Sequence, residues 1–362
     1  MQLIKSWFER QFNNPQVVIL TVLLLTVFAV IYFLGRMLIP LFAGLIIAYL
    51  LDGVVKQFTR RGVPRLVGVL ISFIFFMLLL IFSIFWLVPM LTKQVTQLVQ
   101  QLPTMISEAQ SLLLQLPEEY PRFISEDQVY EVFSVIRGEV GRMAQNILAI
   151  SAASVMGLIT LLVYLVIVPL LVFFFLKDKD KILDWFTGFL PRDRSLAAQV
   201  WDDVNMQIAN YIRGKTWEII IVWIGTFLVF TLLNLQYAML LGLIVGFSVL
   251  IPYVGAAVAT IPIALVAYFQ WGLGSEFIWV LVAYAIIQVL DGNVLAPLLL
   301  AEVVDIHPVG VITSILVFGG LWGFWGVFFA IPLATVIQAI IKAWPKQEKV
   351  PASDGSAAEA ED

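Results

Sequence analysis

The stretch that decides the fold is residues 66–88, LVGVLISFIFFMLLLIFSIFWLV, which contains no charged side chain. A helix needs about 20 apolar residues to cross the hydrocarbon core of a bilayer, and a barrel strand needs about 10. The run is continuous and does not alternate between apolar and polar positions, which favours a spanning helix over an outer-membrane strand. We therefore expect an all-α polytopic membrane protein.

Similar apolar runs recur along the chain. Those long enough to span lie at 16–35, 66–88, 151–176, 217–235, 275–290 and 324–342. Shorter or interrupted runs lie at 37–51, 237–251, 254–270 and 307–320. We expect eight to ten membrane segments including broken or re-entrant helices, and the runs at 237–251 and 254–270 either span the bilayer or re-enter.

The composition excludes several classes of protein. The 362 residues are 61% hydrophobic and 13% charged, whereas soluble domains carry roughly 45–50% apolar and about 25% charged residues. A soluble enzyme could not cover so much apolar surface, and a net charge of −4 argues against a nucleic-acid partner. The chain has no Cys and one His, so we expect no metal, no cofactor and no catalytic residue, and an enzyme is the least favoured class.

Basic residues set the expected orientation, because Lys and Arg gather on the cytoplasmic side of a membrane. They cluster in 52–65 and 177–216 and near both termini, so both termini are expected in the cytoplasm. The predicted organisation is an interfacial amphipathic helix at 1–15, N-terminal membrane helices at 16–88, an external amphipathic helical hairpin at 89–150, a membrane helix at 151–176, cytoplasmic interfacial helices at 177–216, a C-terminal membrane core with helix breaks at 217–345, and a disordered acidic tail at 346–362.

The C-terminal core has acids but no bases. Between Thr216 and Ile341 there is no Lys or Arg, yet Glu218, Glu276, Asp291, Glu302 and Asp305 are present. Carboxylates in such a region cannot be neutralised by internal ion pairs, so we expect them to be protonated, solvated or paired with a cationic ligand.

Two interruptions point to a site. Residues 242–255 and 290–297 combine glycine, proline and polar residues inside apolar runs, and transporters use unwound backbone at membrane depth to bind solutes. An ordinary inter-helix turn or a solvated loop would have the same residue composition. The candidate residues of a substrate or ion pathway are Asp291, Asn293, Glu276, Glu302, Asp305 and His307. The candidate helix breaks or hinges are Gly246, Pro252, Gly255, Gly292, Pro297 and Pro308.

Several motifs resemble the autoinducer-2 exporter family of bacterial inner-membrane permeases, and within it a PerM-like subfamily. The motifs lie at 168–179, 210–214, 246–255, 287–293, 307–308 and 318–332. The resemblance implies a multispan permease of about eight transmembrane helices in the bacterial inner membrane, assembled as a homo-oligomer such as a pentamer. It also implies export of the furanone signal autoinducer-2 by some relatives and sodium–proton antiport by others.

The leading hypothesis is a secondary transporter that exports a small polar solute across the bilayer, with Asp291 as the coupling group and Asn293 as a hydrogen-bond partner. Such a solute could be an autoinducer-2-like signal, and export could be coupled to protons. One alternative is a sodium(lithium)/proton antiporter that moves a monovalent cation through the same acids. The other is a non-transport membrane scaffold.

Overall fold

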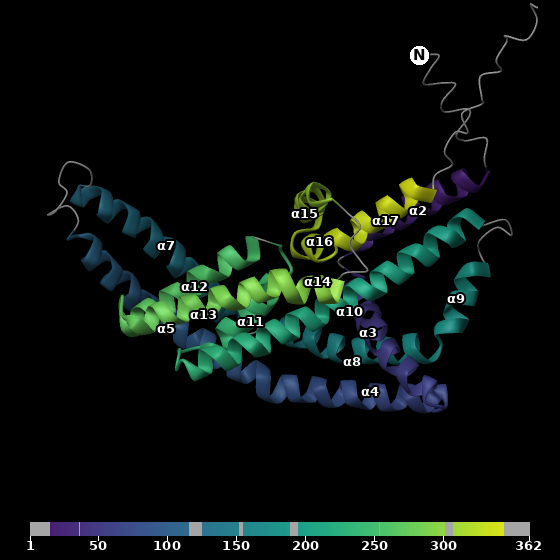
Figure 1. Ribbon diagram of the computed structural model, residues 1–362, viewed down its shortest axis with the longest axis horizontal. Coiled ribbons are helices and arrows are strands. Elements are labelled where there is room, and N and C mark those ends of the chain that lie inside the picture. Colours follow the sequence, from purple (N-terminus) through teal and green to yellow (C-terminus); the bar gives the residue numbers. More distant parts are fainter. Residues whose placement is uncertain are drawn as a thin grey trace, which may run out of the picture.

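The fold is described by a computed structural model that covers residues 15–35, 37–115, 125–151, 155–188, 195–252, 254–300 and 307–343. All regular structure in these ranges is helical (Figure 1), as the apolar runs predict. The helices of the first half are α2 (Pro15–Leu34), α3 (Ile39–Arg60), α4 (Arg65–Phe82), η1 (Ser83–Leu87), α5 (Val88–Leu113), α7 (Glu126–Ser151), α8 (Val155–Lys177) and α9 (Lys179–Gly188). Those of the second half are α10 (Ser195–Leu232), α11 (Ala238–Ser248), α12 (Val254–Trp271), α13 (Ser275–Leu290), η2 (Asp291–Leu295), α14 (Ala296–Leu300), α15 (Pro308–Trp322), α16 (Phe324–Phe328) and α17 (Ala330–Ala343).

Five helices are long and apolar enough to cross a membrane by length and composition. Five shorter apolar helices of 10–17 residues accompany them in the described ranges. This pattern supports a multi-pass membrane protein, while the total of eight to ten segments stays a prediction. The predicted interfacial helix at 1–15 (apart from its last residue) and the tail at 346–362 lie outside the described residues.

The first bundle consists of α3, α4 and α8. Its core is apolar and includes Ala48, Val69 and Val172, each at most 5% exposed. Gly44 lets α3 approach α8 closely, because a Cβ there would lie 3.0 Å from the Cβ of Leu171. The outward faces of α4 are exposed and apolar, as expected for helices whose solvent is lipid.

One helix of 49 residues, Arg65–Leu113, joins α4 to α5 through η1. The backbone widens to a π-helix at Ser83–Leu87, where the N–H of Val88 donates to the carbonyl of Ser83. Pro89 is the second residue after this π-helix. Because proline lacks an N–H, a strict α-helical hydrogen-bond pattern cannot continue here. At 1.5 Å per residue the whole helix is about 73 Å long, more than twice the roughly 30 Å hydrocarbon core.

The far end of this helix pairs with α7 and forms a hairpin, which projects at the left of Figure 1. Ile106, Val129 and Phe133 are buried between the two helices. Helices α5 and α7 therefore contact each other through these residues, while the packing of the other amphipathic positions in 89–150 stays a prediction. Location of the hairpin outside the membrane stays a prediction.

The second bundle is built around α10, a continuous helix of 38 residues. The boundary predicted at Thr216, between interfacial and membrane helices, falls inside it. Helix α11 packs against α10 through two glycines: a Cβ on Gly242 would lie 3.0 Å from the backbone N of Phe227, and one on Gly246 would lie 2.8 Å from the Cβ of Trp223. Small residues spaced four apart allow this close helix contact.

The predicted break within 242–255 is confirmed, because α11 ends at Ser248 and α12 begins at Val254. Gly255 lies so close to the end of α11 that a Cβ would fall 1.7 Å from the carbonyl oxygen of Ser248. At 11 residues, α11 is about 17 Å long and too short to cross the bilayer alone.

The second predicted break takes a different form from a loop or turn. The chain stays helical from Ser275 to Leu300, with a π-helical segment at Asp291–Leu295. The N–H of Ala296 donates to the carbonyl of Asp291, and Pro297 is the second residue after the π-helical segment. This is the relation seen between η1 and Pro89, and proline again explains the wider turn. The interpretation of 290–297 as a solvated loop is wrong.

Candidate functional site

The candidate site lies where α10 packs against α13, η2 and α14, which lie side by side with it in Figure 1. Helix α10 contributes a buried ion pair. The ammonium Nζ of Lys215 lies 2.9 Å from both carboxylate oxygens of Glu218, and these side chains are only 5% and 2% exposed. The i,i+3 spacing places the two groups on neighbouring positions of the helix surface.

Asp291 comes to this pair from the other side of the seam. It is the first residue of η2 and is buried, with 9% exposure. It interacts electrostatically with both Lys215 and Glu218. One basic and two acidic side chains therefore share a buried environment, and π-helical turns of this kind are often found at functional sites.

Asp291 and α10 carry buried polar atoms without a hydrogen-bond partner among the described residues. They include the Oδ1 of Asp291 and the Oγ1 of Thr226. A buried polar group without a partner costs about 1–3 kcal/mol, and such groups call for an explanation. The Oδ1 of Asp291 is thus an acceptor that a hydroxylated solute could use.

The structure places the other predicted pathway residues elsewhere. Asn293 is exposed, and its Nδ2 donates to the carbonyl of Val289 on the same helix. Glu276 is exposed in the first turn of α13, which puts it about 22 Å along the helix axis from Asp291. Exposed His307 caps α15 by accepting a hydrogen bond from the N–H of Val309 at 3.3 Å. Glu302 and Asp305 lie outside the described residues.

The predicted hinge residues have varied surroundings. Gly246 is a packing position inside α11, and Pro252 lies in the connection that follows this helix. Gly292 is exposed within η2, and Pro297 lies in α14 just after it. Pro308 begins α15. A hinge function stays a prediction for each of these residues and for Gly255.

No group of three or more His, Cys, Asp or Glu side chains that could hold a metal ion occurs in the described part of the chain. The charged groups that the structure brings to the seam are the carboxylates of Glu218 and Asp291 and the ammonium group of Lys215. Groups of this kind can form charge-assisted hydrogen bonds.

The sequence of the whole span can be compared with known proteins. Residues 20–346 match the family model described as AI-2E family transporter. The chain belongs to the AI-2E transporter family. It is therefore a transporter or permease, and a multi-pass membrane protein.

Relatives of this transporter carry names that describe transport. The chain is 44% identical over 345 residues to PerM of Escherichia coli strain K12, whose name calls it a permease, covering 95% of this chain and 98% of PerM. It is 26% identical over 314 residues to the transport protein YueF of Bacillus subtilis, covering 85% and 84% of the two chains. It is 23% identical over 331 residues to the AI-2 transport protein TqsA of Escherichia coli, covering 91% and 92%. These names do not favour a scaffold or an antiporter.

The buried pair of this AI-2E transporter was not among the residues predicted for the site. The premise that no base reaches the acids of the C-terminal core is wrong, because Lys215 directly precedes the stretch that was counted. A usable signal was present in the sequence, since Lys215 and Glu218 have i,i+3 spacing next to a long apolar run. The predicted boundary at Thr216 separated the two residues.

Proposed function

We propose that this transporter exports a small, neutral, polyhydroxylated solute across the bacterial inner membrane through the seam between α10 and α13–η2–α14. The observation that carries the proposal is the buried Asp291, with an unpaired carboxylate oxygen next to the Lys215–Glu218 pair. Polar and ionisable residues at membrane depth mark solute and ion pathways. An autoinducer-2-like signal is the leading candidate solute, supported by the name of TqsA.

The charges favour a neutral solute over an anion. Two carboxylates and one ammonium group face this seam, so an anion would meet an excess of negative charge when Asp291 is ionised. Carboxylate oxygens accept hydrogen bonds from hydroxyl groups, and such charge-assisted bonds are stronger than neutral ones. A polyol therefore fits the available acceptors.

Proton coupling is the second part of the proposal. Protonation of Asp291 would remove one negative charge beside Lys215 and would strengthen the hold of this lysine on Glu218. Binding and release of one proton at Asp291 would thus change the balance of charges in the seam during each cycle. An Asp291→Asn variant cannot titrate, so it should lose the pH dependence of transport.

The test is flux of the labelled furanone signal in proteoliposomes that contain the purified full-length protein. We expect Asp291→Asn to lower the flux at least tenfold and Glu218→Gln to lower it as well. The matched control is Asp202→Asn, which makes the same carboxylate-to-amide change at an exposed position of α10 and should retain wild-type flux. Wild-type flux in Asp291→Asn would contradict the proposed site.

The same vesicles distinguish the antiporter. They carry an internal pH dye and receive a sodium pulse without the furanone signal. We expect no change of internal pH. Sodium-driven proton movement that disappears in Asp291→Asn would replace the exporter with a sodium/proton antiporter.

Assembly and orientation complete the proposal. We propose a homo-oligomer, with a pentamer as the leading candidate, in which both termini face the cytoplasm. Mass measurement of the purified protein in nanodiscs would give the number of subunits. Accessibility of tags at each terminus in spheroplasts would give the orientation, and a tag labelled from outside would contradict it.

A further inference from the structure

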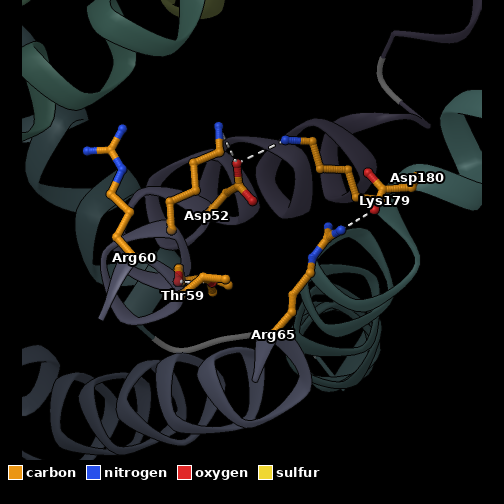
Figure 2. Close-up of a pocket in the computed structure, with 8 residues that line it drawn as sticks. Asp52, Thr59, Arg60, Arg65, Lys179 and Asp180 are labelled. Carbon is orange, nitrogen blue, oxygen red and sulfur yellow. Dashed lines mark hydrogen bonds and ion pairs between the residues drawn. The ribbon is translucent and has the colours of Figure 1, made fainter. Parts of the chain in front are cut away.

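A second charged pocket lies between the end of α3, the start of α4 and the start of α9 (Figure 2). Its volume is about 380 Å³. It is lined by Asp52, Val55, Lys56, Thr59, Arg60, Arg65, Lys179 and Asp180. None of these residues belongs to the seam proposed for transport.

Internal ion pairs hold the acidic side chains of the pocket. The carboxylate of Asp52 lies 2.9 Å from the Nζ of Lys179 and 3.3 Å from the Nζ of Lys56. Arg65 donates to Asp180 across the pocket, as Figure 2 shows. Four basic side chains thus face two acids, so positive charge is in excess.

Arg60 is the basic side chain of the pocket that takes no part in these ion pairs. It is exposed and lies at the end of α3, and it makes no ion pair with any residue that the structure describes. A guanidinium group presents several N–H donors in a planar fork that matches the oxygens of a phosphate. Lys56, whose side chain is 57% exposed, provides a second accessible cation.

The N-terminal end of α4 also favours an anion, whereas the C-terminal end of α3 carries the opposite partial charge. Helix α4, with 18 residues, begins at Arg65 and has no acidic residue in its first turn. The N-terminal end of a helix carries a partial positive charge and unpaired N–H groups. Both features add to the attraction of the basic side chains.

The position of the pocket points to a lipid as the source of the phosphate. It is located at the ends of α3 and α4, which are candidate membrane spans. From its first turn onward α4 exposes apolar side chains, including Leu66 at 54% and Leu70 at 41%. Basic pockets at the ends of membrane helices suit anionic head groups, and acyl chains would find an apolar helix surface beside this one.

We propose that this pocket binds the phosphate of an anionic phospholipid head group, with Arg60 and Lys56 as its principal contacts. Asp52 holds Lys56 in place and is itself paired with Lys179, while Arg65 and Asp180 pair across the pocket. The site is distinct from the transport pathway and would anchor the first bundle to α9 through a shared lipid.

The experiment measures lipid binding to the purified full-length protein in neutral detergent by native mass spectrometry, with phosphatidylglycerol as the probe and phosphatidylcholine as the zwitterionic reference. We expect phosphatidylglycerol to bind the wild type more tightly than phosphatidylcholine. Arg60→Gln should weaken this binding by about fivefold, in line with an exposed charge pair of up to ~1 kcal/mol. The double variant Lys56→Gln/Arg60→Gln should weaken it further.

The matched control is Arg61→Gln. Arg61 is the next residue, is exposed, and does not line the pocket, so binding should stay at the wild-type level although the same charge is removed. Equal weakening in Arg60→Gln and Arg61→Gln would mean attraction by the general surface charge and would overturn the proposal. Soluble glycerol phosphate is added as a competitor at the concentration at which phosphatidylglycerol binds. If it displaces the lipid, the pocket is a site for free phosphate compounds, and the lipid assignment is overturned.

Discussion

Removal of Lys215 should destabilise the protein far more than removal of its partner. In Lys215→Met, the carboxylates of Glu218 and Asp291 share a buried environment from which the ammonium group has been removed, and like charges in such a site repel strongly. Breaking one partner out of a buried ion pair costs about 3–5 kcal/mol. In Glu218→Gln, Lys215 keeps Asp291 as an electrostatic partner, so we expect only the cost of an imperfect hydrogen bond, about 1–3 kcal/mol.

The measurement is thermal unfolding of the purified variants in one detergent, followed by tryptophan fluorescence. At about 2 °C per kcal/mol, Lys215→Met should lower the midpoint by about 6–10 °C, and Glu218→Gln by clearly less. The double variant Lys215→Met/Glu218→Leu should recover much of the loss, because a buried pair replaced by apolar residues of similar size is often neutral.

Two results would refute this reasoning. Equal midpoints for Lys215→Met and Glu218→Gln would mean that Asp291 does not act as the second partner of the lysine. A double variant no more stable than Lys215→Met would mean that packing, and not charge, dominates at these positions.

Two further changes test the packing. Gly255→Ala should prevent correct folding, because the new Cβ would lie 1.7 Å from a carbonyl oxygen at the end of α11. The control Gly225→Ala, whose Cβ would meet nothing within 4 Å, should be neutral or stabilise α10 by up to ~1 kcal/mol. The folded yield in size-exclusion chromatography distinguishes the two variants. Phe133→Ala should loosen the α5–α7 hairpin by about 3 kcal/mol, because Phe133 is 5% exposed, and Val132→Ala at a 55% exposed position should not. Hydrogen exchange of α7 measures this difference, and equal exchange in both variants would contradict the packing described for the hairpin.

The sequence predicts the helical elements well, since long uncharged runs have few other structures open to them in a bilayer. The break before Val254 was also predictable, because Pro252 and Gly255 interrupt an apolar run. The π-helical form of 291–295 was not. Pro297 indicates that the α-helical hydrogen-bond pattern is interrupted. Whether the backbone then forms a loop or a wider helical turn depends on packing neighbours that only the fold brings together.

The sequence alone points to one residue of the proposed site. Asp291 was singled out because it ends an uncharged run, and the structure buries it beside two other charged groups. Asn293, predicted as a hydrogen-bond partner of the solute, is exposed and bonds its own helix. The pocket at Asp52 could not be predicted from the sequence. Helices α3 and α9 are separated by more than a hundred residues and meet only in the folded chain.

The glycine contact between α10 and α11 bears on where this protein can move. At Gly242 and Gly246 the two backbones touch almost without intervening side chains, so sliding one helix along the other would drive the bulkier residues on either side of the glycines into the opposite backbone. The two helices must then travel as a single stiff part. Any change of shape that opens the protein first to one side of the membrane and then to the other has to occur elsewhere, and a hinge at the widened turn 291–295, which contacts α10, stays a prediction.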